Sequence, residues 1–173
     1  MVSAKGSLRT EGFPYALDNG AWTAHVKGLP FDSGAFLKAL DLLGAEADFI
    51  VIPDIVAGGE RSLEFSLTWI NRVRPYGRMM LLPVQDEMTV DMVEPHIAPD
   101  MGLFIGGTTE FKERTIPLWG AFSCYVHCGR VNSRRRLKLC KHAGVDSFDG
   151  SGPSRFVKHA RRMDAELRQW ILQ

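Results

Sequence analysis

The stretch Phe49-Ile-Val-Ile-Pro-Asp54 decides the fold, because it is an uninterrupted apolar run that ends in an aspartate. Such a run, without alternation of apolar and polar residues, is typical of a strand buried on both faces of a parallel sheet. Gly58-Gly59 interrupts the chain after it, and Leu63, Leu67 and Ile70 then recur at helical spacing. The stretch therefore predicts a buried strand followed by an amphipathic helix.

The alternation of strand and helix continues along the chain and predicts an α/β fold with parallel strands. Right-handed crossovers leave either an open doubly wound sheet or a barrel. Polar residues or glycines stand at the expected strand ends: Asp18, Asp54, Gln85, Gly106-Gly107, His127 and Asp149. Polar strand ends that converge around one opening favour a TIM-like (β/α) barrel. Because 173 residues is short for eight strand-helix units, we expect the barrel to be compact or incomplete.

Three local patterns make more specific predictions. Asp18-Asn-Gly20 is expected to form a turn after a strand. Pro117 is expected to break a helix over residues 110–118, since proline cannot donate a helical hydrogen bond. A last helix is expected over residues 153–172, with Pro153 in its first turn.

Size and composition indicate a single barrel domain spanning residues 1–173, with the 45% hydrophobic and 24% charged content of ordinary globular proteins. No run approaches the roughly 18 apolar residues of a membrane helix, so no membrane partner is expected. The N-terminus lacks the apolar core of a signal peptide. The three cysteines, Cys124, Cys128 and Cys140, suggest no disulfide framework and favour a reducing cytoplasm.

Charge is unevenly distributed along the chain. Residues 126–173 contain 11 Lys and Arg against 4 Asp and Glu, a net +7, whereas residues 1–125 contain 10 against 16, a net −6. A basic segment of this kind is suited to a polyanion such as nucleic acid. A solvated helical surface accounts for it equally simply.

The segment Gly144-Val-Asp-Ser-Phe-Asp-Gly-Ser-Gly-Pro-Ser-Arg155 is the strongest candidate for chemistry. It predicts a short strand that ends at Asp149 in a glycine-rich turn. Catalytic groups of α/β barrels lie at the carboxyl ends of strands, so Asp149 is a candidate nucleophile. Its alternative role is to form the turn or to cap the following helix.

Taken in order, five motifs resemble the tRNA-guanine transglycosylase superfamily. They are Phe49-Ile-Val-Ile-Pro-Asp54, Ser62-Leu-Glu-Phe-Ser-Leu-Thr-Trp69, Pro83-Val-Gln85, Ile105-Gly-Gly107 and the segment over residues 144–155. The last is similar to the family's Gly-Val-Asp-x-Phe-Asp-Cys-x-x-Pro-Thr-Arg motif, whose second Asp is the nucleophile. The resemblance implies that Asp149 is the nucleophile and Asp54 the general acid and base.

The chain departs from the family's pattern in two places. The family's zinc motif, Cys-x-Cys-x-x-Cys with a later His, has no counterpart, and Gly150 replaces the Cys that follows the nucleophile. No zinc site or other cofactor is therefore expected. Side chains alternate between the two faces of a strand, so His127 is not expected to bind one metal ion together with Cys124 or Cys128. The sequence Leu17-Asp-Asn-Gly-Ala-Trp22 resembles the DpdA branch of phage and bacterial proteins, which are associated with inserting 7-deazaguanines into DNA.

The resemblance assigns the remaining candidate residues to two groups. Residues expected to bind the purine are Asp18, Gln85, Gly106, Gly107 and His127. Residues expected to hold nucleic-acid phosphates are Arg130, Arg134, Arg135, Arg136, Lys138 and Arg155. The expected partners are DNA and a 7-deazaguanine base such as preQ0, and a homodimer or partner subunit is left open.

Three other functions remain open at the sequence level. The chain could exchange guanine in RNA instead of DNA. It could be a nucleic-acid binding or accessory barrel without turnover. It could also be an unrelated barrel hydrolase that uses Asp54 and Asp149 as a glycosidase pair, for which a carboxylate separation of about 5–5.5 Å indicates a retaining mechanism.

Overall fold

The computed structural model describes residues 1–77, 79–150 and 164, and it has the expected α/β fold. Seven parallel strands form one sheet whose spatial order follows the sequence. They are β1 (Val2–Ser3), β2 (Leu17–Asp18), β3 (Ile50–Val51), β4 (Met80–Val84), β5 (Met101–Ile105), β6 (Val126–Cys128) and β7 (Ser147–Phe148).

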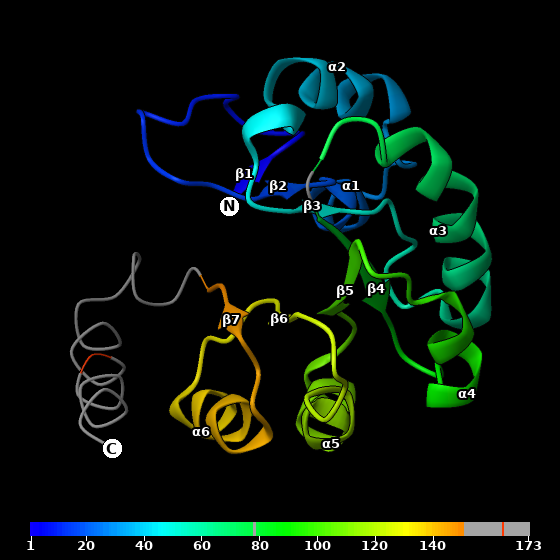
Figure 1. Cartoon of the computed structure of the whole chain (residues 1–173), viewed down its shortest axis with the longest axis vertical. Coiled ribbons are helices and arrows are strands. Elements are labelled where there is room, and N and C mark those ends of the chain that lie inside the picture. The colour runs from blue at the N-terminus through cyan, green and yellow to red at the C-terminus, as the bar shows by residue number, and fades with distance from the viewer. Residues whose placement is uncertain (78, 151–163, 165–173) are drawn as a thin grey trace.

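The strand order distinguishes a barrel from an open doubly wound sheet. Each strand pairs in parallel with its successor, with none of the order reversal that defines a doubly wound fold. The sheet curls as an arc that is open between β1 and β7 (Figure 1). Within the described residues β1 and β7 are not paired with each other, so the barrel is incomplete, as expected from the short chain.

The longer helices cover the convex side of the arc (Figure 1). Helices and short helical turns follow most strands. They are α1 (Ala21–Val26), α2 (Ser33–Leu43), η1 (Gly44–Glu46), α3 (Gly59–Val73), α4 (Val90–Val93), η2 (Glu94–His96), α5 (Thr109–Trp119) and α6 (Arg134–Ala143). None of them, in the part of the chain that the structure describes, is both long and apolar enough to cross a membrane. The expected last helix over residues 153–172 lies outside the described residues, apart from Asp164.

Side-chain caps fix where several helices begin. Asp32 accepts a hydrogen bond from the amide of Ala35 at the start of α2, at 2.9 Å. Ser133 accepts one from the amide of Arg136 at the start of α6, at 3.3 Å. A cap of this kind satisfies one of the amides that have no partner within the first helical turn. α6 ends at Gly144, whose left-handed φ of 74° suits glycine.

One local prediction was wrong, and one helix was not predicted. Pro117 does not break its helix, because α5 continues to Trp119, and the complete burial of Ile116 and Trp119 offsets the hydrogen bond that proline cannot donate. The Asp18-Asn-Gly20 turn leads directly into α1, a helix that we did not predict. With six residues, α1 is too short to display a helical pattern in the sequence.

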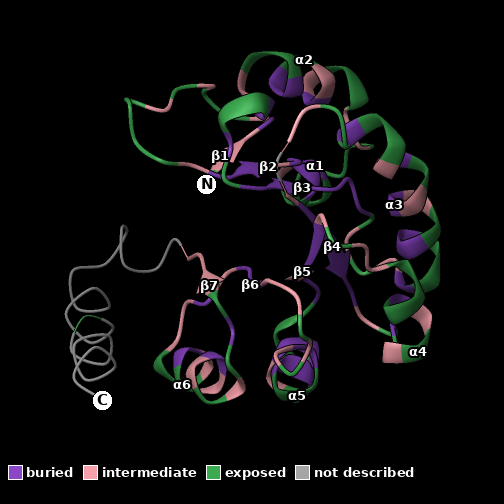
Figure 2. Ribbon diagram, viewed as in Figure 1, coloured by how far each residue is buried: buried purple, intermediate pink, exposed green. Residues whose placement is uncertain are grey.

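Alternation along the strands produces two apolar layers. Ile50 and Leu82 face the helices, whereas Val51 and Leu81 face the inside of the arc, where they pack with Phe104. The central strands β3 to β6 are largely buried, the edge strands β1 and β7 are half-buried, and the helices are exposed on their outer faces (Figure 2).

Candidate active site

A cavity of about 580 Å³ opens at the carboxyl ends of the strands. Its volume is in the range that holds a nucleoside-sized ligand. The inner apolar layer contributes Val51 and Phe104 to its wall. The chain brings seven of the predicted site residues into this wall: Asp18, Asp54, Gln85, Gly106, Gly107, Arg130 and Asp149.

Asp149 directly follows β7 and is held at both carboxylate oxygens. Oδ1 accepts the backbone amide of Arg130 at 2.9 Å, and Oδ2 lies 3.2 Å from Nε2 of His127. Burial is the largest single influence and would raise the pKa of Asp149, but these two hydrogen bonds and nearby positive charge together hold the pKa below its usual value of 3.8. Its side chain keeps 31% exposure, so Asp149 is an ionised carboxylate with access to the cavity.

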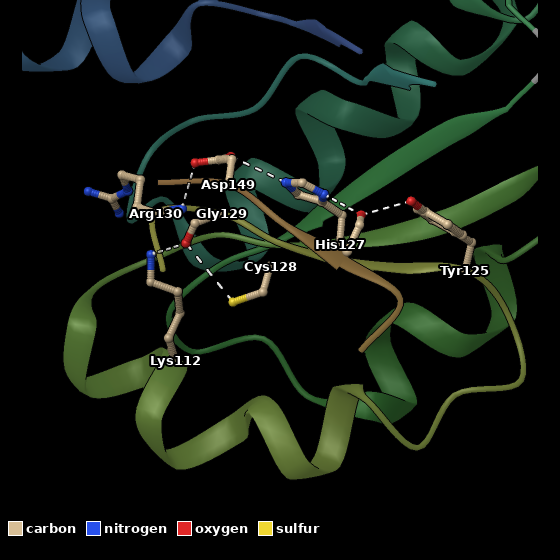
Figure 3. A network of polar contacts seen from close by, with 8 residues as sticks. Lys112, Tyr125, His127, Cys128, Gly129, Arg130 and Asp149 are labelled. Carbon is tan, nitrogen blue, oxygen red and sulfur yellow. Dashed lines mark hydrogen bonds and ion pairs between the residues drawn. The ribbon is translucent and has the colours of Figure 1, made fainter. Parts of the chain in front are cut away.

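His127, predicted to contact the purine, is not part of the cavity wall. Its ring contacts Asp149 instead (Figure 3). Its Nδ1 lies 2.7 Å from the hydroxyl of Ser147, which also accepts a hydrogen bond from Tyr125. The buried imidazole stacks on Phe104, with ring centroids 5.2 Å apart. These contacts fix the ring so that Nε2 points at Asp149.

Asp54 follows β3 and is almost completely buried, with 7% exposure. Asn19 donates to its Oδ1 at 2.7 Å, and the side-chain amide of Gln85 donates to its Oδ2. Burial is the main cause that raises the pKa of Asp54 to about 6, and the nearby charge of Asp18 raises it further against these hydrogen bonds. Asp54 can therefore hold or release a proton near neutral pH.

Asp18 is the third carboxylate in the cavity wall. Burial raises its pKa above the usual 3.8, and the charge of Asp149 acts in the same direction. Asp18 and Asp54 are thus shifted toward the protonated form, whereas Asp149 is shifted toward the ionised form. Titratable groups whose pKa values are displaced in opposite directions within one site can divide acid, base and nucleophile roles.

The predicted purine contacts are only partly free to bind a ligand. The Gln85 side chain donates to Asp54 and accepts the amide of Ala57 at 3.3 Å, so it orients Asp54 as well as lining the cavity. The amide of Gly106 donates to the carbonyl of Val84 at 2.9 Å. Of the two glycine amides, only that of Gly107 has no acceptor among the described residues.

Arg130 lies in the cavity wall, apart from the arginines of α6. Its guanidinium carbon is 3.6 Å from the centre of the Trp22 ring, and its Nη2 donates to the carbonyl of Gly107 at 2.6 Å. Arg130, Trp22 and Gly107 also line a second cavity of about 320 Å³ at the start of α5. The Arg130 cation therefore stands between two adjoining cavities.

Four of the other predicted phosphate-binding residues lie in the first two turns of α6, outside the walls of both cavities. Arg135 forms an ion pair with Glu113 at 3.2 Å and is 75% exposed. Arg136 donates to the hydroxyl of Thr109 at 3.0 Å. Arg134 and Lys138 are exposed on the same helix, and Arg155 lies outside the described residues.

Asn19 is a site residue that the sequence analysis did not identify. We interpreted it as part of a turn, whereas its buried amide donates to the carbonyl of Ile52 and to Asp54. No local pattern reveals this role, because Asn19 and Asp54 are 35 positions apart in the chain. Among the described residues, no cluster of three or more His, Cys, Asp and Glu side chains could hold a metal ion.

No family model matches the chain, and no curated protein sequence matches it.

The raised pKa of Asp54 predicts a pH-dependent difference in stability between the wild type and an Asp54→Asn variant. Its folded pKa exceeds the unfolded value, so its contribution to stability is complete below about pH 3.8 and is lost as pH rises through about 6. At about 1.4 kcal/mol for each pKa unit, this loss is about 3 kcal/mol. In urea unfolding, the free energy of unfolding of the variant should increase by about that amount relative to wild type as the pH rises from 4 to 7.

An Asp100→Asn variant is the matched control for this measurement. Arg74 holds the pKa of Asp100 below 3.8, mainly through a side-chain hydrogen bond, so the stability of this variant relative to wild type should change little between pH 4 and pH 7, and the stabilising contribution of Asp100 is lost only below about pH 3.8. A constant difference between Asp54→Asn and wild type from pH 4 to pH 7 would contradict a raised pKa at Asp54.

Proposed function

We propose that this chain is a guanine transglycosylase that exchanges guanine in DNA for a 7-deazaguanine base such as preQ0. One observation carries the proposal: Asp54 and Asp149 line a single cavity, and their pKa values are displaced in opposite directions. The resemblance of their motifs to the transglycosylase superfamily gives the substrate class. The cytoplasmic location that the cysteine content favours belongs to the same proposal.

In the first half-reaction Asp149 attacks C1′ of the target nucleotide. Its carboxylate forms a C–O bond as the C1′–N9 bond breaks, and the electron pair of that bond leaves with the guanine. Protonated Asp54 gives its proton to the departing base, which leaves as neutral guanine. Its pKa of about 6 keeps a useful fraction of Asp54 protonated near neutral pH.

In the second half-reaction the incoming base replaces guanine in the cavity. Asp54, now a carboxylate, removes the N9 proton of the 7-deazaguanine, and N9 attacks C1′ as the bond to Asp149 breaks. This step restores the Asp149 carboxylate and the Asp54 proton. No oxidant, reductant or metal ion is consumed in either half-reaction.

Two apolar side chains and one backbone amide are suited to hold the purine. Val51 and Phe104 offer apolar surface in the cavity wall, and the amide of Gly107 is available to donate a hydrogen bond. Gln85 and Asn19 hold the Asp54 carboxyl group at a fixed position against the base. Precise positioning of a general acid against its proton acceptor is required for efficient proton transfer.

The target base must be single-stranded or flipped out of a duplex to reach Asp149. The strand that carries it would leave the cavity past Arg130 and Trp22, which line both cavities. A guanidinium at this place can bind a phosphodiester, and an exposed tryptophan can contact a neighbouring base. Trp22 is 42% exposed.

We expect Arg130→Ala to weaken DNA binding more than Arg135→Ala does. Arg130 lies in the wall of both cavities, whereas the exposed Arg135 is already paired with Glu113. Loss of one phosphate contact should reduce the slope of log affinity against log salt by about 1. Fluorescence titration of a guanine-containing oligonucleotide at several salt concentrations measures this slope. Equal slopes for the two variants would refute a phosphate contact at Arg130.

Base exchange itself is tested with the purified chain, labelled guanine and matched DNA and RNA oligonucleotides. The proposal predicts that label enters DNA, and that mass spectrometry of nucleosides detects a 7-deazaguanine nucleoside when preQ0 is supplied. Label in RNA but not in DNA would identify an RNA-directed enzyme. Binding without exchange or base release would favour an accessory barrel, and free guanine without exchange would favour a hydrolase. Exchange by the chain alone would show that no partner subunit is needed.

A further inference from the structure

Lys112 is a buried lysine that the proposed reaction does not use. It lies on α5 with 1% exposure, and its Nζ donates to the carbonyl of Gly129 at 3.0 Å. Burial, and then the positive charge of Arg130, lower its pKa to about 8. None of the ion pairs among the described residues includes Lys112. Burial of a cation without a paired anion is costly, so this position calls for a compensating interaction.

That interaction passes through a single peptide group. The carbonyl of Gly129 and the amide of Arg130 belong to the same peptide, and that amide donates to Oδ1 of Asp149 at 2.9 Å. The ammonium of Lys112 and the carboxylate of Asp149 therefore lie at opposite ends of one peptide dipole (Figure 3). The positive charge faces the carbonyl oxygen and the negative charge faces the amide hydrogen, so both charges stabilise the same orientation.

The backbone at this peptide would otherwise disfavour that orientation. Arg130 has a φ of 57°, in the left-handed region that costs a residue with a side chain of the order of 1–2 kcal/mol. Rotation of the peptide by half a turn would relieve this strain. It would also direct the carbonyl of Gly129 at Asp149 and the amide of Arg130 at Lys112, which places like charges together.

Packing restricts movement of the peptide on its Gly129 side. A Cβ atom at Gly129 would lie 2.5 Å from the ring of Phe104, and that ring stacks on His127. The segment is also tied to the strand end, because the amide of Val131 donates to the carbonyl of Asp149 at 2.6 Å. The peptide is thus enclosed between α5, the inner apolar layer and Asp149.

We propose that Lys112 is a positioning residue for Asp149, fixing the Gly129–Arg130 peptide so that its amide is donated to the carboxylate. Lys112 acts through this peptide and touches neither base nor sugar. Its consequence for catalysis rests on the proposed function, in which Asp149 is the nucleophile. Its effect on the ionisation of Asp149 does not, so the two proposals can fail separately.

The test is the pKa of Asp149 in wild type, Lys112→Met and Lys112→Gln, measured by NMR from the pH dependence of the chemical shift of its carboxyl carbon. Methionine fills the space with neither charge nor donor, and glutamine supplies a neutral donor. We expect the pKa to rise by about one unit with methionine and by less with glutamine. The other titratable or charged groups that act on Asp149 are unchanged in both variants: His127, Arg130, Asp18, Cys128 and the N-terminal amino group of Met1. Thr115→Val, which removes another buried polar group from α5, should leave this pKa unchanged.

Exchange kinetics provide a second readout. In Lys112→Met we expect kcat to fall by about tenfold with little change in KM, and the acidic limb of the pH profile to move up with the Asp149 pKa. If the methionine variant does not fold, the glutamine variant carries the same measurement. An Asp149 pKa that is the same in the folded variant and in wild type would overturn the proposal. Absence of exchange in wild type would overturn the proposed function and leave the NMR result to decide the role of Lys112.

Discussion

Replacing Asp149 by asparagine is expected to lower the rate of base exchange by more than about 10⁴-fold, as loss of a covalent nucleophile does in other enzymes. Asparagine can still accept the amide of Arg130, which holds Oδ1 of Asp149 at 2.9 Å, so the backbone around it should be retained. What it cannot do is form a stable bond to C1′. The measurement is incorporation of labelled guanine into DNA under single-turnover conditions.

Asp146→Asn is the matched control for the nucleophile variant. Asp146 is three positions earlier in the same segment, is exposed, and is not part of the cavity wall. It accepts the amide of Val126 at 2.7 Å, a hydrogen bond that asparagine can also accept. We expect its rate to stay within a few-fold of wild type. Equal activity of Asp149→Asn and wild type would remove Asp149 from the mechanism.

The second large effect is expected at Asp54. Asp54→Asn should lower the rate by about 10²–10⁴-fold, the usual contribution of a general acid and base. The pH profile should change as well. In wild type, guanine release should increase as Asp149 ionises, below pH 3.8, and decrease as pH rises through about 6, because Asp54 loses the proton that it must donate. The asparagine variant should lose the descending limb near pH 6.

Asp18→Asn separates the role of Asp54 from that of its neighbour. The charge of Asp18 contributes to the raised pKa of Asp54, so its removal should move the descending limb to lower pH without abolishing it. A limb near pH 6 that persists in Asp54→Asn and disappears in Asp18→Asn would assign the acid to Asp18 instead. Single-turnover release of guanine from pH 4 to pH 8 distinguishes these outcomes.

The overall architecture could be predicted from the sequence because it depends on repeated local patterns. Apolar runs such as residues 49–54 predict buried parallel strands, and the carboxyl ends of parallel strands lie at one edge. The strand ends alone predicted that Asp54, Gln85, Gly107 and Asp149 lie together, and all four line one cavity.

The contacts within the site could not be predicted, because they join residues that are distant in the chain. Lys112 would ordinarily be assigned to a solvated helix face, and only the approach of Gly129 shows why it is buried. His127 and Gln85 stand at strand ends as expected, yet they orient Asp149 and Asp54. Arg130 is close in sequence to the arginines of α6, but its left-handed backbone places it in the cavity wall.

The most direct test of the central claim is to trap the glycosyl-enzyme. Incubation with a guanine-containing DNA oligonucleotide, without an incoming base, should give a covalent complex whose mass is that of protein plus oligonucleotide minus guanine. Proteolysis and mass spectrometry should place the attachment on Asp149, and added preQ0 should release the oligonucleotide with the new base in place. Base exchange by wild type with no adduct on Asp149 would contradict the mechanism.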